Sequence, residues 1–164
     1  ALPYIDPFIS NGSIKADSEY AWQILSGAIQ HCYEGWITPG DYINEGDCLK
    51  VPARDVQAWA YMLFADLEEG YVPPMENMGP HISYDGGTDM YSFDFADGPV
   101  YMPEVADKIV EGNTTVLALY HQDMEDENLY MATDLIFVKD RAVPEELGGR
   151  RLINISFGQY DYNY

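Results

Sequence analysis

The sequence has 164 residues, of which 28 are Asp or Glu and only 8 are Lys or Arg, so its formal net charge at pH 7 is −20. A negative charge of this size repels nucleic acid and anionic membrane surfaces, and both are excluded as partners. The apolar content of 47% is ordinary for a folded protein, and a chain of this length predicts a single domain with a normal core.

The first part of the chain predicts two helices. The first is capped at residues 17–18 and runs to about Tyr33, because its apolar residues recur at helical spacing. Residues 36–49, rich in Gly, Asp and Asn, are expected to form a loop. Pro52 then opens a second helix in its first turn, where a missing N–H costs nothing, and Gly70 ends it.

The rest of the chain predicts strands. Residues 71–89 are a connection rich in Pro and Gly, and residues 91–95 alternate between aromatic and smaller side chains, as a half-buried strand does. Residues 104–110 fit a strand or a short helix, and the flanking Pro103 and Gly112 favour a strand. Three further strands are expected at residues 114–122, 129–139 and 151–158.

Consecutive strands with short connections predict an antiparallel meander. With the helices first, the fold class is α+β, with two N-terminal helices packed on a C-terminal antiparallel sheet. Residues 1–16 are expected to be the remnant of a linker and residues 17–164 a single domain. The longest uncharged helical run, residues 20–33, is too short to span a membrane.

No motif for catalysis or cofactor binding is present. The three histidines, His31, His81 and His121, have no metal-ligand spacing, and the chain contains neither a nucleophile elbow nor a glycine-rich phosphate loop. We therefore predict no catalytic residue, no cofactor and no metal centre.

Residues 41–47 resemble half of a calcium loop, with acidic residues and a glycine at suitable positions. Ile43 and Pro52 stand where two essential oxygen ligands would be needed, so the segment is not an EF-hand. A weak surface calcium site here or at residues 123–128 stays open, although solvated acidic loops are favoured.

The candidate ligand site centres on Asp134, which is the only charged residue within residues 128–138. If its strand face lies under the helices, desolvation raises the pKa of Asp134 and makes it a candidate acid, base or ligand anchor. Tyr120, Tyr130 and His121 would then lie nearby. If the face meets water, Asp134 is a surface residue, and this alternative is favoured.

Cys32 and Cys48 are 16 positions apart. A disulfide between them would stabilise the fold by about 3 kcal/mol in the chain-entropy model. The alternative is two reduced cysteines that act as small apolar residues. We expect both to be reduced and Cys32 to be buried.

The order of two helices, a turn-rich connection and a C-terminal meander resembles the small cones of the NTF2-like and cystatin-like superfamilies. Residues 49–56, followed by residues 63–64, resemble a helix opening of uncharacterised exported or lipid-anchored proteins of Gram-positive bacteria. Residues 134–139 and 151–156 resemble the final hairpin of the same proteins. The resemblance implies an extracellular or cell-surface location and no settled activity.

Three hypotheses for function follow from these patterns. The first is an exported, non-enzymatic binding or accessory domain, with a cationic protein or a small molecule as ligand. The second is an NTF2-like enzyme that uses Asp134 in the pocket of a cone. In the third, the acidic surface itself docks a cationic protein or calcium.

Overall fold

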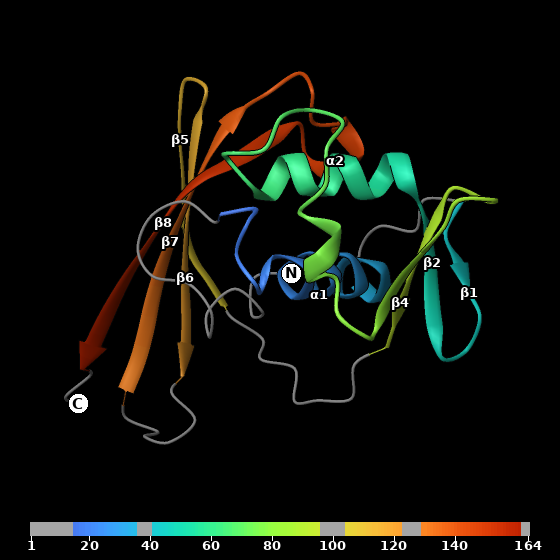
Figure 1. Cartoon of the computed structure of the whole chain (residues 1–164). Helices are drawn as coiled ribbons and strands as arrows, with labels where there is room; N and C mark the ends of the chain where they lie inside the picture. The colour runs from blue at the N-terminus through green and yellow to red at the C-terminus, as the bar shows by residue number, and fades with distance from the viewer. Residues whose placement is uncertain (1–14, 36–40, 96–103, 123–128, 162–164) are drawn as a thin grey trace.

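The computed structural model describes residues 15–35, 41–95, 104–122 and 129–161. Within them, two α-helices lie between two four-stranded antiparallel sheets, so the α+β class is confirmed (Figure 1). The expected order of helices before strands is wrong, because two short strands separate the helices. In chain order the elements are α1 Ala21–Gly35, β1 Ile43–Asn44, β2 Cys48–Pro52, α2 Ala53–Leu63, η3 Met75–Asn77, β3 Ile82–Asp85, β4 Met90–Asp94, β5 Glu104–Glu111, β6 Thr114–Gln122, β7 Leu129–Lys139, η4 Glu145–Leu147 and β8 Arg150–Asp161.

The first sheet has the strand order β1-β2-β4-β3, and the sequence predicted only one of its members, β4. The loop expected at residues 36–49 is wrong where it covers β1 and the start of β2. Leu49 and Val51 are fully buried and pair with Phe93 and Tyr91 of β4. Only two apolar positions alternate in β2, which is too short a pattern to stand out among polar neighbours.

The helix positions follow the predicted apolar spacing. Ser18 begins the turn that leads into α1: its hydroxyl accepts a hydrogen bond from the Tyr20 N–H, and its carbonyl accepts one from Ala21. α2 begins directly after Pro52 but ends at Leu63, well before Gly70. The next residue, Phe64, has extended backbone and is fully buried, so the chain leaves the helix in order to fill the core.

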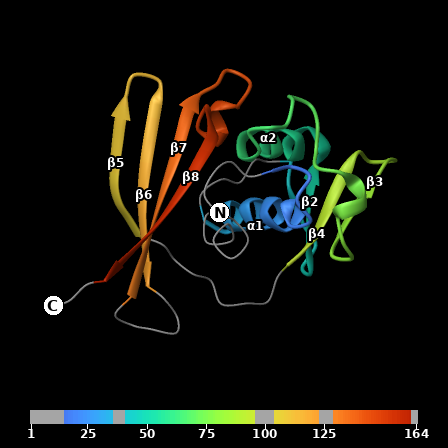
Figure 2. The ribbon, with the colours of Figure 1, turned by 60° about the vertical axis from the view of Figure 1, so that its left-hand side comes forward.

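The second sheet is a meander of four consecutive strands, β5-β6-β7-β8. The strands expected in this region are confirmed, and residues 104–110 belong to a strand. Leu117, Leu135 and Ile155 lie in register across β6, β7 and β8, and all three pack in or against the core. The helices lie on one side of this sheet, next to β7 and β8 (Figure 2).

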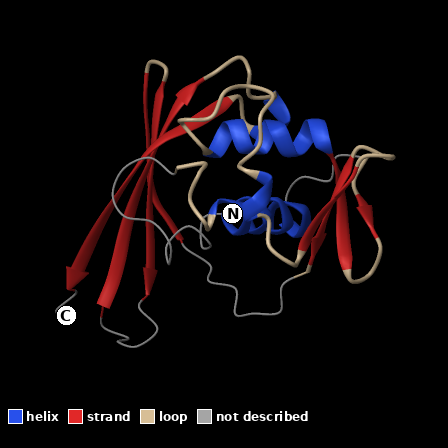
Figure 3. Ribbon diagram, viewed as in Figure 1, coloured by secondary structure: helices blue, strands red, loops and turns tan. Residues whose placement is uncertain are grey.

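Both helices lie between the two sheets (Figure 3). A hydrophobic cluster of buried residues includes members of both helices and both sheets. Trp22 connects α1 to the first sheet and to the segment that follows α2. Its ring lies 5.5 Å from that of Tyr91 in β4, and its Nε1–H donates to the Pro74 carbonyl at 2.9 Å. Ala16, the last residue of the expected linker, belongs to the core: it is buried, and its N–H donates to the Asp66 carboxylate. In the described chain, no helix is long and apolar enough to cross a membrane.

Candidate binding groove

The structure places Asp134 on the face of β7 that is turned away from the helices. Its neighbour Leu135 is buried and points to the core, whereas Asp134 is exposed. Asp134 pairs in register with Ala118 and Ser156, on the opposite face from the buried residues. The condition for the enzyme hypothesis, a carboxylate desolvated beneath the helices, is not met at this position.

The other three predicted site residues lie on β7 itself and on the neighbouring strand β6. Tyr120 pairs with Ala132, His121 with Met131, and Tyr130 with Gln122. The backbone therefore brings the four predicted positions onto two adjacent strands, β6 and β7. The side chains of Tyr120, His121 and Tyr130 lie outside the described part of the structure.

A groove of about 540 Å³ opens where β2 passes into α2, beside the hairpin that joins β3 to β4. Its volume falls in the range typical of small-ligand sites. Its lining combines apolar with charged and hydroxyl side chains, and the described lining includes neither His nor Cys. The lining residues are Asp41, Ile43, Pro52, Ala53, Arg54, Thr88, Asp89 and Met90.

The floor of the groove is fixed by contacts between the helix start and the hairpin. Pro52 pairs with Met90, and the Ala53 N–H, one of the free donors at the start of α2, bonds to the Asp89 carbonyl at 3.0 Å. Asp89 has a left-handed backbone, with φ at 55°. The Tyr84 hydroxyl donates to its carboxylate at 2.6 Å and holds it beside the groove.

The hairpin turn is organised by a second carboxylate, Asp85. Its oxygens accept hydrogen bonds from the Gly87 N–H at 2.9 Å and from the Thr88 hydroxyl at 3.0 Å. These bonds lower the pKa of Asp85 below its usual value, with the bond from Gly87 as the main cause, and keep the carboxylate charged. The turn thereby positions Thr88 at the edge of the groove.

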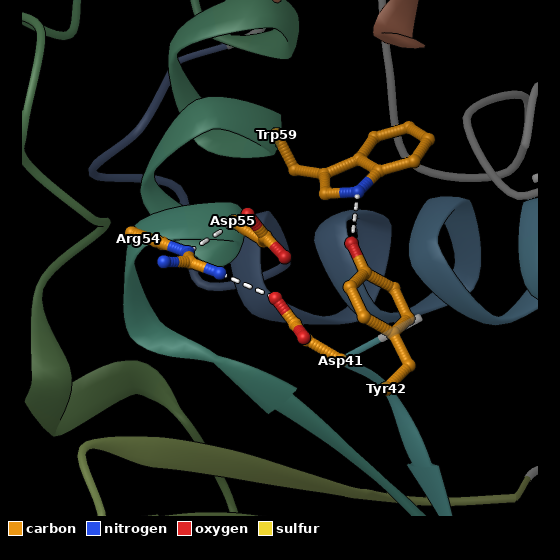
Figure 4. A network of polar contacts seen from close by, with 5 residues as sticks. All are labelled: Asp41, Tyr42, Arg54, Asp55 and Trp59. Atoms are coloured by element: carbon orange, nitrogen blue, oxygen red, sulfur yellow. Dashed lines mark hydrogen bonds and ion pairs between the residues drawn. The ribbon is translucent and has the colours of Figure 1, made fainter. Parts of the chain in front are cut away.

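Arg54 is the cation of the groove, and carboxylates surround it (Figure 4). It forms an ion pair with Asp41, and its Nε lies 3.8 Å from Asp55. Burial raises the pKa of Asp55, with Arg54 opposing the shift and Asp41 and Glu146 adding to it. Since Arg54 is 72% exposed, it shields these carboxylates only in part.

The segment that carries Asp41 is anchored to α2 by an aromatic pair. The Trp59 Nε1–H donates to the Tyr42 hydroxyl at 3.1 Å (Figure 4). Trp59 is buried on the inner side of α2, and Tyr42 packs against the core. This contact holds Asp41 beside Arg54 at the mouth of the groove.

The segment considered as a calcium loop forms the hairpin between β1 and β2 instead. Glu45 pairs with Lys50 at 3.0 Å, and Gly46, at φ 90°, donates its N–H to the side chain of Asn44. The carboxylates of Asp41 and Glu45 thus neutralise cations of the chain itself. No group of three or more His, Cys, Asp or Glu among the described residues could hold a metal. Residues 123–128, the second calcium candidate, lie outside them.

Cys48, in β2, carries a free thiol and is half-buried. Burial raises its pKa, and the neighbouring Asp47 and Glu45 add to the shift. The side chain of Cys32, expected to be buried, lies outside the described residues, although its backbone belongs to α1.

The sequence alone did not single out Asp41, Arg54 and Asp89 as a group. The available signal was the apolar pair Leu49 and Val51 before Pro52, which indicates a strand that runs directly into a helix. The partner hairpin cannot be identified from that signal, because it comes from a distant part of the chain. Comparison with protein-family models, with curated proteins and with solved structures gives no match.

Proposed function

We propose that this chain is a non-enzymatic binding domain, exported and held at the bacterial cell surface, that binds a cationic partner in the groove at the start of α2. One observation carries the proposal. The groove has an apolar floor and three carboxylates, Asp41, Asp55 and Asp89, in or beside it, against the single guanidinium of Arg54.

This combination fits the side chain of a lysine or an arginine in a partner protein. Such a side chain has an apolar stem and a charged head, so it buries the stem while the head stays hydrated or paired. Ile43 and Met90 offer the apolar contact, and Asp89 the charge. The net charge of −20 steers a basic partner toward the surface from a distance.

The location and the fold family rest on the resemblance to exported or lipid-anchored proteins of Gram-positive bacteria. A four-stranded meander with helices on one face supports an NTF2-like or cystatin-like cone for the C-terminal half. The first sheet, β1 to β4, is an addition to that plan.

The groove is tested with the blocked tripeptides Ala-Lys-Ala and Ala-Glu-Ala, followed by amide NMR shifts. We expect the lysine peptide to shift Ala53, Asp89 and Met90, and the glutamate peptide to leave them unchanged. The double variant D41N/D89N is expected to weaken binding of the lysine peptide about tenfold, because it removes the Asp89 carboxylate and leaves the Arg54 guanidinium without its Asp41 partner in the groove. Asn is suitable at position 89 because it tolerates a positive φ.

The matched control is D134N, which removes an exposed carboxylate of the second sheet that is not part of the groove lining. It should bind the lysine peptide as the unchanged protein does. The proposal fails if millimolar lysine peptide shifts no groove amide, or if D134N weakens binding as much as D41N/D89N.

Export is tested separately, from the gene. A signal peptide or a lipid-attachment cysteine encoded upstream of Ala1 is the expected finding. An initiator Met encoded immediately before Ala1 would contradict the proposed location.

A further inference from the structure

β5 is an end strand of the second sheet, and in the described part of the chain it pairs only with β6. We propose that the free edge of β5 receives an added strand from a basic protein segment, in which Lys or Arg residues alternate with a branched apolar residue. This surface is separate from the groove at α2, and the inference does not depend on the function proposed there.

The hairpin between β5 and β6 shows which backbone groups face the open edge. Glu111 pairs with Thr114 across a two-residue turn that has Gly112 in its first position, at φ 58°. Such a turn makes Glu111 and Thr114 a hydrogen-bonded pair, and the bonding alternates along the ladder. Asp107 and Ile109 therefore bond to β6, and the N–H and C=O groups of Lys108 and Val110 point away from it.

The contact of Lys108 agrees with this alternation. Its backbone N–H donates to the carboxylate of Asp107 at 2.8 Å. The Asp107 oxygen thus occupies the place of a carbonyl oxygen from an added strand. A partner strand can displace it, and the freed carboxylate then becomes available for a basic side chain of the partner.

A bulge between Val105 and Asp107 interrupts the ladder, so the regular free edge begins at Asp107 and ends at the turn after Glu111. A bulge is one of the devices that restrict uncontrolled pairing at sheet edges. The remaining five residues are all exposed, with Ile109 at 49% and Val110 at 52%. Five residues are enough for a short added strand.

The side chains on this edge define the partner. Asp107, Ile109 and Glu111 pair with Ala118, Val116 and Thr114 and so share one face of the sheet. In the next rows of that face, Asp134 pairs with Ala118, and Ile136 with Val116. A partner strand gains most from an apolar residue opposite Ile109 and basic residues opposite Asp107 and Glu111, because cross-strand pairs of opposite charge are favourable.

A second copy of this chain fits the edge less well. Two β5 strands paired antiparallel about Ile109 place Asp107 of each opposite Glu111 of the other, and like charges in that position are destabilising. Each copy also carries a net charge of −20. The charge therefore favours a basic segment of a different protein.

The probe is a blocked peptide, Thr-Lys-Thr-Ile-Thr-Lys-Thr, measured by calorimetry and by amide hydrogen exchange on the whole chain. We expect binding in low salt and slower exchange at Val110. The variant V110P removes the outward N–H without removing a bond to β6, and should weaken binding at least about tenfold. D107N/E111Q should weaken binding and reduce its dependence on salt.

Three controls keep the outcome decisive. A peptide with Glu in place of both Lys should not bind, and a peptide methylated on alternate backbone nitrogens should lose binding even if V110P fails to fold. D41N/D89N, which alters only the groove, should bind the probe normally. Unchanged binding to V110P, no binding at millimolar peptide, or a chain that dimerises through β5 without the peptide would overturn the proposal.

Discussion

The guanidinium carbon of Arg151 lies 3.7 Å from the centroid of the Tyr61 ring. The same group bonds to carbonyls at the end of α2 and just after it: its Nε donates to Tyr61 and a terminal nitrogen to Phe64, both at 2.7 Å, and the Leu67 carbonyl receives a further bond. Carbonyls at a helix end have no partner within the helix. A residue of β8 therefore caps α2 from a distant part of the chain.

We expect R151A to lower the free energy of unfolding by about 2–4 kcal/mol, because it leaves part-buried carbonyls without donors. R151K should recover only part of the loss, since an ammonium cannot reproduce the planar set of donors or the stacking on Tyr61. Urea unfolding of the three proteins measures both effects. Full stability of R151K would show that the charge alone matters.

Asp140 gives a prediction for acid unfolding. It accepts hydrogen bonds from the Tyr61 hydroxyl and the Ala142 N–H, and the first is the main reason why its pKa is lowered. A lowered folded-state pKa stabilises the fold above the unfolded pKa of about 3.9, and the contribution is lost as pH falls through the folded pKa.

The variant D140N should therefore be less stable than the unchanged protein at pH 7, and should lose less of its melting temperature between pH 5 and pH 3. Y61F should also lower the free energy of unfolding, by about 1 kcal/mol at pH 7, because it removes one hydrogen bond. Scanning calorimetry across this range is the measurement. If the melting temperature of D140N falls between pH 5 and pH 3 by as much as that of the unchanged protein, the stabilising role of Asp140 is contradicted.

The large negative charge predicts that stability near pH 5 exceeds stability near pH 8 in low salt. Asp55 contributes in the same direction: burial raises its pKa, so its ionised form destabilises the fold, and this penalty falls as pH drops toward the folded pKa. Added salt should raise the melting temperature at pH 8 by screening repulsion. A melting temperature that falls steadily from pH 8 to pH 5 would show that paired carboxylates dominate.

Asp134 should be dispensable for folding. It is exposed on the face of β7 opposite the core, so D134A should change the free energy of unfolding by less than about 0.5 kcal/mol. L135A, at the neighbouring buried position, is the matched comparison and should cost about 2–5 kcal/mol. Equal costs in urea unfolding would place Asp134 in the core after all.

Cys48 should react slowly with anionic thiol reagents at neutral pH. Its raised pKa leaves little thiolate, and Asp47 and Glu45 repel an anionic reagent. The measurement is the reaction rate of Cys48 with a dinitrobenzoate disulfide, compared with the rate of free cysteine. The ratio of the two rates should rise with pH and with salt.

We also expect two free thiols in the denatured, unreduced chain. A count of zero would show that Cys32 and Cys48 form a disulfide.

The amino-acid sequence determined the parts of the fold whose patterns are long and local. The apolar residues of α1 and the alternating strands β6 and β7 were predictable because each element repeats its own period over enough residues. The meander followed from short connections between consecutive strands. The net charge of −20 is likewise a property of composition.

Tertiary structure decided what depends on pairing between distant segments. β1 has two residues and β3 has four, too few to show a period, and they become strands only because β2 and β4 offer them hydrogen-bond partners. The same holds for the groove, where Asp41 and Asp89 meet the start of α2 although many residues separate them in the chain. Because side chains alternate along β7, the sequence determined that Asp134 and Leu135 lie on opposite faces. Which of the two faces meets water depends on the side on which the helices pack, because the helices remove apolar surface from solvent on that side.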